Sequence, residues 1–251
     1  MGRLSLTFTH YFKRAFRDPM NLIFFVLLPV ALMMFNMVGG LGMMDEAQMG
    51  NAQQMATVLA AVFMVSFQFF SGEVLLYSIF DDIRGDMRWR LSASPVPRRT
   101  FVIGAALASW MFNLLQAALI FGVTAVVFDV YWSEPWVMVA VVLLISVMSQ
   151  LIAAVITQIA KTRKMGSGIS MGLNFGMMAL SGFLFIPLGD GPISTFLTTH
   201  GTPISLASRA ILYAGPVLDD MSEAFFNMGI LFAINMVLVV LLFVLGRRRN
   251  A

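Results

Sequence analysis

Glu73 is the residue whose position suggests chemistry most directly, because it is the one acidic residue inside a long apolar stretch. A charged side chain at the centre of a bilayer costs about 2.5–3.5 kcal/mol on insertion scales. The carboxyl group must therefore face protein or water, or carry a proton. One role for such an acid is proton coupling in a transporter. The other is a structural pairing, for example with an arginine near the inner membrane surface.

Catalytic and metal-binding chemistry finds little support in the sequence. There is no cysteine, which excludes disulfides and thiolate metal sites. His10 and His200 fall on opposite sides of the membrane in the predicted topology, so they cannot share a metal, and no Ser/His/Asp set can form on one aqueous face. A P-loop needs glycine directly before its lysine, whereas the three lysines follow Phe12, Ala160 and Arg163. We therefore expect no enzyme activity, cofactor or ATP site in this chain.

The composition predicts that lipid is the solvent of this protein. Apolar residues make up 59% and charged residues 12% of the 251 residues, whereas soluble domains have about 45–50% and about 25%. A membrane crossing takes about 20 apolar residues, and six crossings with short loops use nearly the whole chain. Residues 1–251 are therefore predicted to form a single transmembrane domain. The first apolar run is too long for a signal-peptide core, so no cleavable signal is expected.

Six apolar stretches are predicted to cross the membrane as helices, over residues 19–40, 55–80, 100–128, 135–160, 166–187 and 224–246. Fifteen of the sixteen Lys and Arg residues fall before, between or after these spans on one side, and only Arg209 does not. Cationic loops stay in the cytoplasm, so both termini are predicted to be cytoplasmic. The basic residues are spread over four segments rather than gathered on one folded face, which argues against nucleic-acid binding.

The predicted spans are joined by segments with recognisable end signals. Residues 3–17 alternate apolar and basic positions at helical spacing, which predicts an amphipathic helix in the inner interface, or else an ordinary flanking segment. Asp18-Pro19 supplies an N-cap and a first helical residue, and Pro29 predicts a kink. The polar residues within spans are expected to form hydrogen bonds between helices. They are Asn113, Gln116, Gln150, Gln158 and Asn235.

The loop 81–99 is the most polar part of the sequence. Residues 82–91 have the pattern of a short charged helix, in which Asp86 precedes Arg90 by four residues. The prolines of Ser94-Pro95-Val96-Pro97 would end it. An apolar stripe would run along it through Ile83, Met87 and Leu91. Such a stripe needs a cover, which could be the inner membrane surface or a groove on a partner protein.

This arrangement resembles the membrane subunit of type-2 ABC exporters. The shared features are an interfacial helix, a span that opens with Arg17-Asp18-Pro19-Met20-Asn21, a charged inner helix, and the turn Ser94-Pro95-Val96-Pro97-Arg98 before the third span. Asp82 stands where the family often has Glu, and Gly85 where it has Gly. The resemblance covers the whole chain in topology, but its specific motif covers only about residues 81–104.

The resemblance implies a division of labour between subunits. Loop 81–99 would hold a cytoplasmic coupling helix that docks on a separate ABC ATP-binding subunit, present in two copies that bind ATP and magnesium. Dimerisation of these subunits on ATP would shift the spans between inward-facing and outward-facing states. The residues expected to make the contact are Asp82, Arg84, Asp86, Arg88, Trp89 and Arg90. The outer segment 188–223 would contain the family's re-entrant helical hairpin, with a helix that starts at Thr202-Pro203.

In this family the second and fifth spans usually border the central path. The implied path residues are Phe67, Gln68, Phe70, Ser71, Asn174, Met177, Met178 and Ser181. The fifth span also places Gly168, Gly172 and Gly176 at four-residue spacing, which lets helices approach closely. This ridge could pack inside one subunit or across a dimer axis with a second permease subunit, identical or different.

Together these features predict an all-α, multi-pass plasma-membrane protein. It would be the permease of an ATP-driven exporter that moves a hydrophobic or amphiphilic substrate such as a drug, lipid, peptide or glycolipid. The alternative is a proton-coupled secondary transporter that uses Glu73, for which more intramembrane charge and an inverted repeat would be expected. A channel or structural membrane protein is the third reading; a channel would need a ring of polar pore-lining residues, which no span shows clearly.

Overall fold

The structure, a computed structural model, describes residues 2–42, 52–85, 88–128, 130, 132, 134–182, 191–215 and 217–250. The described residues form helices and no strands, as the composition predicts. In chain order the helices are α1 (Arg3–Arg17), α2 (Pro19–Leu22), η1 (Ile23–Leu27), α3 (Leu28–Gly42), α4 (Ala52–Phe70), α5 (Gly72–Ser78), η3 (Ile79–Ile83), α6 (Arg88–Ser92), α7 (Arg98–Val127), α8 (Pro135–Ile159), α9 (Arg163–Leu180), α10 (Pro192–Phe196), η4 (Leu197–Gly201), α11 (Pro203–Tyr213) and α12 (Met221–Asn250). The η elements are π-helical turns.

Five helical stretches of the described residues are long and apolar enough to cross a membrane. They are Pro19–Asn36, Gln54–Ile83, Arg98–Val127, Pro135–Ile159 and Met221–Arg247, and they match the first four predicted spans and the sixth. Helix α9 covers most of the predicted fifth span but is not among them. Its first two residues are Arg163 and Lys164, and its glycines, serines and Asn174 lower its apolarity further. Residues 183–187 of that span lie outside the described residues.

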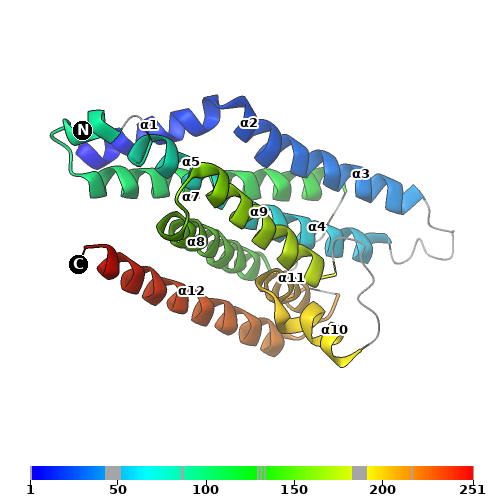
Figure 1. The fold of residues 1–251 in the computed structure, drawn as a ribbon. Helices are drawn as coiled ribbons and strands as arrows, with labels where there is room; N and C mark the ends of the chain where they lie inside the picture. Colours follow the sequence, from blue (N-terminus) through cyan, green and yellow to red (C-terminus); the bar gives the residue numbers. More distant parts are fainter. Residues whose placement is uncertain are drawn as a thin grey trace.

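The helices form an elongated bundle in which the two ends of the chain lie close to the same end (Figure 1). Helices α1 to α3 run along one side, α12 runs along the opposite side, and α4, α7 and α8 lie between them. Helices α10 and α11 lie at the other end of the bundle. The basic residues at the start of α7 and at the end of α12 therefore share one end. Which side of the membrane this end faces stays a prediction from the charges.

The predicted end signals are confirmed where the structure describes them. The Asp18 carboxylate accepts a hydrogen bond of 3.0 Å from the backbone N–H of Met20, and the Thr202 hydroxyl accepts one of 3.0 Å from Ser205. Near Pro29, where a kink is predicted, the backbone N–H of Leu28 donates to the Ile23 carbonyl in a π-helical turn. Such turns are a recognised source of helix bending.

Helix α1 lies side by side with the first half of α7 (Figure 1). Its buried face contains Thr7, Tyr11 and Ala15. The two helices approach closely at Gly104, where an added Cβ would lie 2.8 Å from the Thr7 Cβ. With 30 residues, α7 is about 45 Å long, which exceeds the hydrocarbon core of about 30 Å. Helix α1 therefore covers a part of α7 that can extend beyond the lipid.

The main core lies where α4, α8, α11 and α12 meet. Its fully buried side chains include Met64, Ile145, Met148, Ile204 and Leu231. Helix α11 has Ile204, Leu206 and Ala207 buried, although it is short and lies at the end of the bundle. It contacts η4, which continues α10, and it packs against α4, α8 and α12. Helix α11 is therefore held against the bundle rather than extended into solvent.

Candidate functional site

The second span does not end where the sequence predicts. The helix continues through η3 to Ile83, and the Arg84 N–H still donates to the Ile79 carbonyl at 3.0 Å. The chain then turns at Gly85, where an added Cβ would collide with the carbonyl oxygen of Asp81. The single helix predicted over residues 82–91 is therefore wrong. Within the described residues, the loop helix α6 contains only Arg88–Ser92, and Asp86 and Met87 lie outside them.

The predicted apolar stripe is covered by the chain itself. Ile83 is buried in a cluster with Tyr11 and Phe80, and Leu91 packs against the same cluster. Met87 lies outside the described residues. Neither the membrane surface nor a partner groove is needed to cover Ile83 and Leu91, because α1 and the start of α7 supply the apolar surface.

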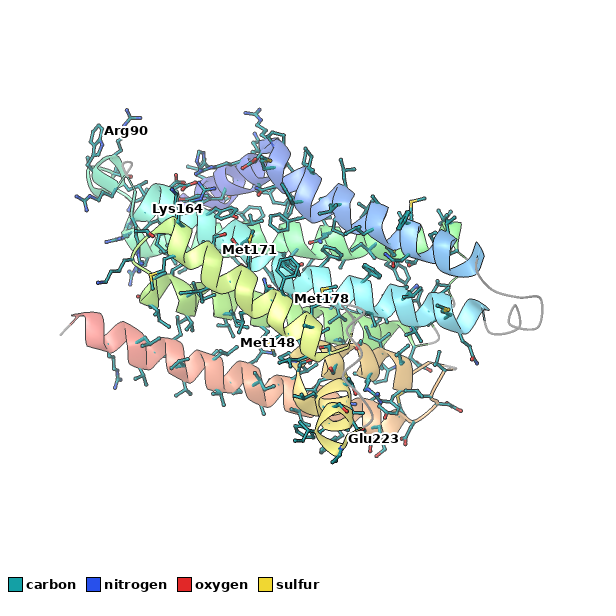
Figure 2. The ribbon with its side chains drawn as sticks, turned by 45° about the vertical axis from the view of Figure 1, so that its right-hand side comes forward. Arg90, Met148, Lys164, Met171, Met178 and Glu223 are labelled. Carbon is teal, nitrogen blue, oxygen red and sulfur yellow. The ribbon has the colours of Figure 1, made fainter. Side chains whose placement is uncertain are left out.

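What α6 presents to solvent is a polar and aromatic tip. Arg88, Trp89 and Arg90 are all exposed, and 63% of Trp89 is accessible. The Arg90 guanidinium lies 5.0 Å from the centre of the Trp89 ring, within cation–π range. Figure 2 shows Arg90 at the tip of the molecule, pointing away from the bundle. Two of the predicted contact residues, Trp89 and Arg90, are therefore accessible to a partner.

The Asp82 side chain, in contrast, pairs with a residue of its own chain. Its carboxylate accepts from Arg14 on α1 and is only 13% exposed. The neighbouring Asp81 bonds the guanidinium of Arg163 at 2.9 Å and contacts that of Arg14 at 3.4 Å. This ion-pair cluster joins α1, the end of the second span and the start of α9.

Burial and the nearby charges shift the pKa of two groups at this cluster, Tyr11 and Arg14. Burial raises the pKa of Tyr11, and the nearby Asp82 carboxylate raises it further. Burial lowers the pKa of Arg14, but the hydrogen bond to Asp82 and the attraction of Asp82 and Asp81 outweigh it, so that pKa is raised. A raised pKa keeps a phenol neutral and a guanidinium charged at neutral pH. Both groups therefore act as permanent donors.

Two further arginines hold the loop against the spans. Arg84 donates to the Ala160 carbonyl at the end of α8 at 3.2 Å, and its guanidinium lies 5.4 Å from the centre of the Phe80 ring. Arg98, at the start of α7, donates to the Ile83 carbonyl at 3.0 Å. These two bonds tie this region to the end of α8 and the start of α7.

A cavity of 680 Å³ lies beside α6, between α1, η3 and the start of α7. Its lining residues are His10, Tyr11, Arg14, Phe80, Asp81, Asp82, Gly85, Arg90, Leu91 and Phe101. It therefore combines the ion-pair cluster with aromatic walls, at the same end of the bundle as the exposed tip of α6.

Glu73 is fully buried between the second span and α9. Its polar neighbours are the hydroxyl groups of Ser170, Tyr77 and Ser167. The Tyr77 hydroxyl lies 3.4 Å from that of Ser167, and the Arg163 guanidinium lies 4.3 Å from the centre of the Tyr77 ring. In the described part of the chain, neither Glu73 oxygen makes a hydrogen bond of good geometry or an ion pair. The acid thus has a polar surrounding but no direct cationic partner.

The predicted path residues of the second span separate into two groups. Phe67 and Phe70 are half-buried, with ring centres 6.0 Å apart, and Phe70 contacts Phe175 of α9 at 5.1 Å. Gln68 and Ser71 are fully buried. The Gln68 amide donates to the Asn113 carbonyl of α7 at 3.0 Å, so it binds a neighbouring helix of the same chain.

The predicted path residues of α9 also divide. Met177 is half-buried, whereas Asn174, Met178 and Ser181 are buried. The Ser181 hydroxyl makes a short hydrogen bond with the Thr202 hydroxyl, which joins the end of α9 to the start of α11. Phe175 was not predicted, although it is 51% exposed and stacks edge-on against Phe70. Its contact with Phe70 of the second span identifies Phe175 as a candidate path residue, and this contact cannot be predicted from the sequence.

The glycine ridge of α9 faces away from its own subunit. Gly168, Gly172 and Gly176 are exposed, and among the described residues a Cβ added at any of them would meet no atom of another helix within 4 Å. Within the described residues, therefore, no other helix packs on this ridge. The exposed apolar residues that surround it are Met165, Ile169, Met171, Leu173, Phe175 and Leu180.

The predicted hydrogen bonds between spans are confirmed in part. The Asn113 amide donates to the Gln68 carbonyl at 3.4 Å, and the Asn235 amide donates to the Leu144 carbonyl of α8 at 3.2 Å. Gln116 and Gln150 are buried, but their amides have no hydrogen-bond partner among the described residues. Sequence alone does not distinguish these two cases.

Comparison with known proteins identifies the family of this chain. A search of curated proteins gives no match. A family model described as ABC-2 type transporter matches residues 4–214, which run from α1 through α11. This match covers more than half of the chain. The chain therefore belongs to the ABC-2 type transporter family and is the multi-pass membrane subunit, or permease, of an ABC transporter, without an ATPase site of its own.

Proposed function

We propose that this permease belongs to an ATP-driven exporter of the plasma membrane, in which it pairs with a second permease subunit and two ATP-binding subunits. The observation that carries the proposal is the exposed tip of α6, which is mounted on a loop anchored to three parts of the bundle. ATP and magnesium would be bound by the partner subunits. This end of the bundle would face the cytoplasm, in line with its basic residues.

The anchoring contacts suggest how force reaches the spans. The ATP-binding subunit would contact Arg88, Trp89 and Arg90, and Asp86 beside them. Movement of α6 would then pull on α8 through Arg84 and on α7 through Arg98. Asp82 would act by holding the loop to α1, not by touching the partner. The cavity beside α6 gives a side chain of the partner a place to enter.

Six spans remain our proposal for the topology. Helix α9 packs against α4, α5 and α8, and with 18 residues it extends about 27 Å. Five crossings would place the two ends of the chain on opposite sides of the membrane, whereas they lie at the same end of the bundle (Figure 1). The α10–α11 hairpin would be the re-entrant element, because its backbone is packed against spans, as non-spanning backbone in a membrane must be.

The substrate path would run along the surface shared by α4 and α9. Phe67, Phe70, Phe175 and Met177 offer aromatic and thioether surface there. Such surfaces adapt to varied apolar shapes, which favours a hydrophobic or amphiphilic substrate such as a drug, lipid, peptide or glycolipid. The buried Gln68, Ser71, Asn174, Met178 and Ser181 would support this surface from behind.

A homodimer axis along the glycine ridge can be tested by cysteine cross-linking. The chain has no cysteine, so a single Gly172→Cys substitution can form a disulfide only with another copy. We expect efficient oxidative cross-linking, because small residues let helices approach within the Cα separation of about 4.4–6.8 Å that a disulfide requires. Val237→Cys, at an exposed position of α12, is the control. Equal cross-linking at both positions, or none at Gly172, would contradict the axis.

A substitution of Glu73 distinguishes ATP-driven transport from proton-coupled transport. We expect the Glu73→Gln variant, reconstituted with its ATP-binding subunit, to retain transport within about twofold, because the amide keeps the shape and removes a buried charge. Transport should need ATP and should survive a protonophore. Uptake assays in vesicles measure both properties in the same preparation. Transport that runs on a pH gradient without ATP, and disappears in Glu73→Gln, would establish the secondary transporter instead.

A further inference from the structure

A second and larger cavity, of 1210 Å³, lies on the other side of the α6 loop. It is bounded by η3, α6 and the starts or ends of α7, α8 and α12. Its lining residues are Ile79, Ile83, Arg84, Arg88, Trp89, Leu91, Arg98, Val102, Thr157, Gln158, Ile159, Ala160, Lys161 and Leu245. Pockets for drug-sized ligands have about 300–1,000 Å³, so there is room for a lipid headgroup and the first part of its chains.

The cavity lies at the level of the membrane surface. Ile159 is the last residue of α8, and Lys161 follows in the loop to α9. Leu245 lies two residues before Arg247, where the last apolar stretch ends. Arg98 begins α7. Three helices, α7, α8 and α12, therefore reach their polar ends around this cavity, which places it at the headgroup region of one leaflet.

The charge of the lining has one sign. Four of its residues, Arg84, Arg88, Arg98 and Lys161, are cationic, and no acidic residue is among the lining residues that the structure describes. Arg98 is held in place by its hydrogen bond to the Ile83 carbonyl, and a carbonyl leaves the guanidinium charge intact. The cavity therefore suits an anion.

The remaining wall is apolar and continues toward the bilayer. Val102, Ile159 and Leu245 line the cavity. On α7 the next turns expose Ile103 and Leu107. Along α12 the exposed apolar residues are Val237, Val240, Leu241 and Val244. A ligand that matches both walls of this site carries an anionic head and an apolar tail that enters lipid.

We propose that this cavity binds an anionic phospholipid of the inner leaflet. Its phosphate lies between Arg98 and Lys161, and its acyl chains follow Ile159 and Leu245 into the bilayer. Basic pockets between membrane helices on the cytoplasmic side suit such headgroups. The lipid would join the α6 loop to α8 and α12. The stability of the loop would then depend on the content of anionic lipid in the membrane. The inference rests on the proposed cytoplasmic orientation of this end.

The test uses the complete permease–ATPase complex in nanodiscs of phosphatidylcholine. Phosphatidylglycerol is titrated in, and bound lipid is counted by native mass spectrometry. We expect the double variant Arg98→Gln, Lys161→Gln to weaken binding by about tenfold or more, since each basic residue near a membrane surface adds about 1 kcal/mol of attraction. The matched control is Arg17→Gln, Lys164→Gln, which also removes one Arg and one Lys, at exposed positions outside this cavity.

Because Arg98→Gln also removes the hydrogen bond to the Ile83 carbonyl, a second variant is needed that leaves this bond in place. Leu245→Trp fills the cavity without changing its charge, and it should also reduce phosphatidylglycerol binding relative to the unsubstituted complex. Equal losses in the lining variant and the control variant, or undiminished binding in Leu245→Trp, would overturn the site. A photo-crosslinking residue at Val102 that captures the ATPase subunit instead of lipid would do the same. Failure of the orientation itself would be detected separately, by external labelling of a cysteine at Lys161.

Discussion

The double substitution Trp89→Ala, Arg90→Glu is expected to uncouple ATP hydrolysis from transport. The assembled complex should still hydrolyse ATP, whereas transport should fall by at least about tenfold. Truncation of a central aromatic or arginine contact commonly costs about 2 kcal/mol or more, and 1.4 kcal/mol is about tenfold in an equilibrium constant. Both side chains lie at the exposed tip of α6, and their loss leaves the buried cluster around Ile83 untouched.

The measurement is ATPase activity and vesicle transport in the same preparation. Lys164→Glu serves as the control, because it reverses an exposed charge at the same end on α9. Reversal of Arg84 tests a different step, since this side chain bonds the Ala160 carbonyl and holds the loop against α8. Coupling in the α6 variant equal to that of the unsubstituted complex would remove α6 as the contact with the ATP-binding subunit.

The sequence predicts well those features that depend on local pattern. Five predicted spans correspond to helices that are long and apolar enough to cross a membrane, because a run of about 20 apolar residues leaves the backbone no alternative in lipid. The starts at Asp18-Pro19 and Thr202-Pro203 are confirmed because a side-chain cap and a following proline act within one turn. The glycine spacing in α9 is visible in the sequence, although the direction of that face is not.

The features that the sequence does not reveal depend on contacts between distant residues. Asp81 meets Arg163 across 82 positions of the sequence and Arg14 across 67. From the sequence, Asp82 is expected to contact a partner subunit. In the structure, its carboxylate forms an ion pair with Arg14 of the same chain. The helix predicted over residues 82–91 failed for a related reason. Ile83 and Leu91 belong to an apolar cluster with α1, and the chain turns at Gly85 between them.

The other large effect is expected at Gly72, where the second span crosses α8 with no space for a side chain. An added Cβ would lie 2.5 Å from the carbonyl oxygen of Ser149 and 3.3 Å from the Cβ of Ala153. The nearest obstacle is backbone, which cannot rotate away as a side chain can. Gly72 also directly precedes Glu73, so any displacement moves the buried acid relative to α9.

We therefore expect Gly72→Ala to destabilise the permease by about 1–3 kcal/mol, the usual cost of overpacking. This corresponds to a lower melting temperature in detergent, by about 2–4 °C per kcal/mol for a chain of this size. Gly122→Ala in α7 is the matched control, because nothing lies within 4 Å of its added Cβ. There the same change should be neutral or stabilise by about 0.5–1 kcal/mol through helix propensity. Equal melting temperatures for the two variants would mean that the second span does not approach α8 this closely.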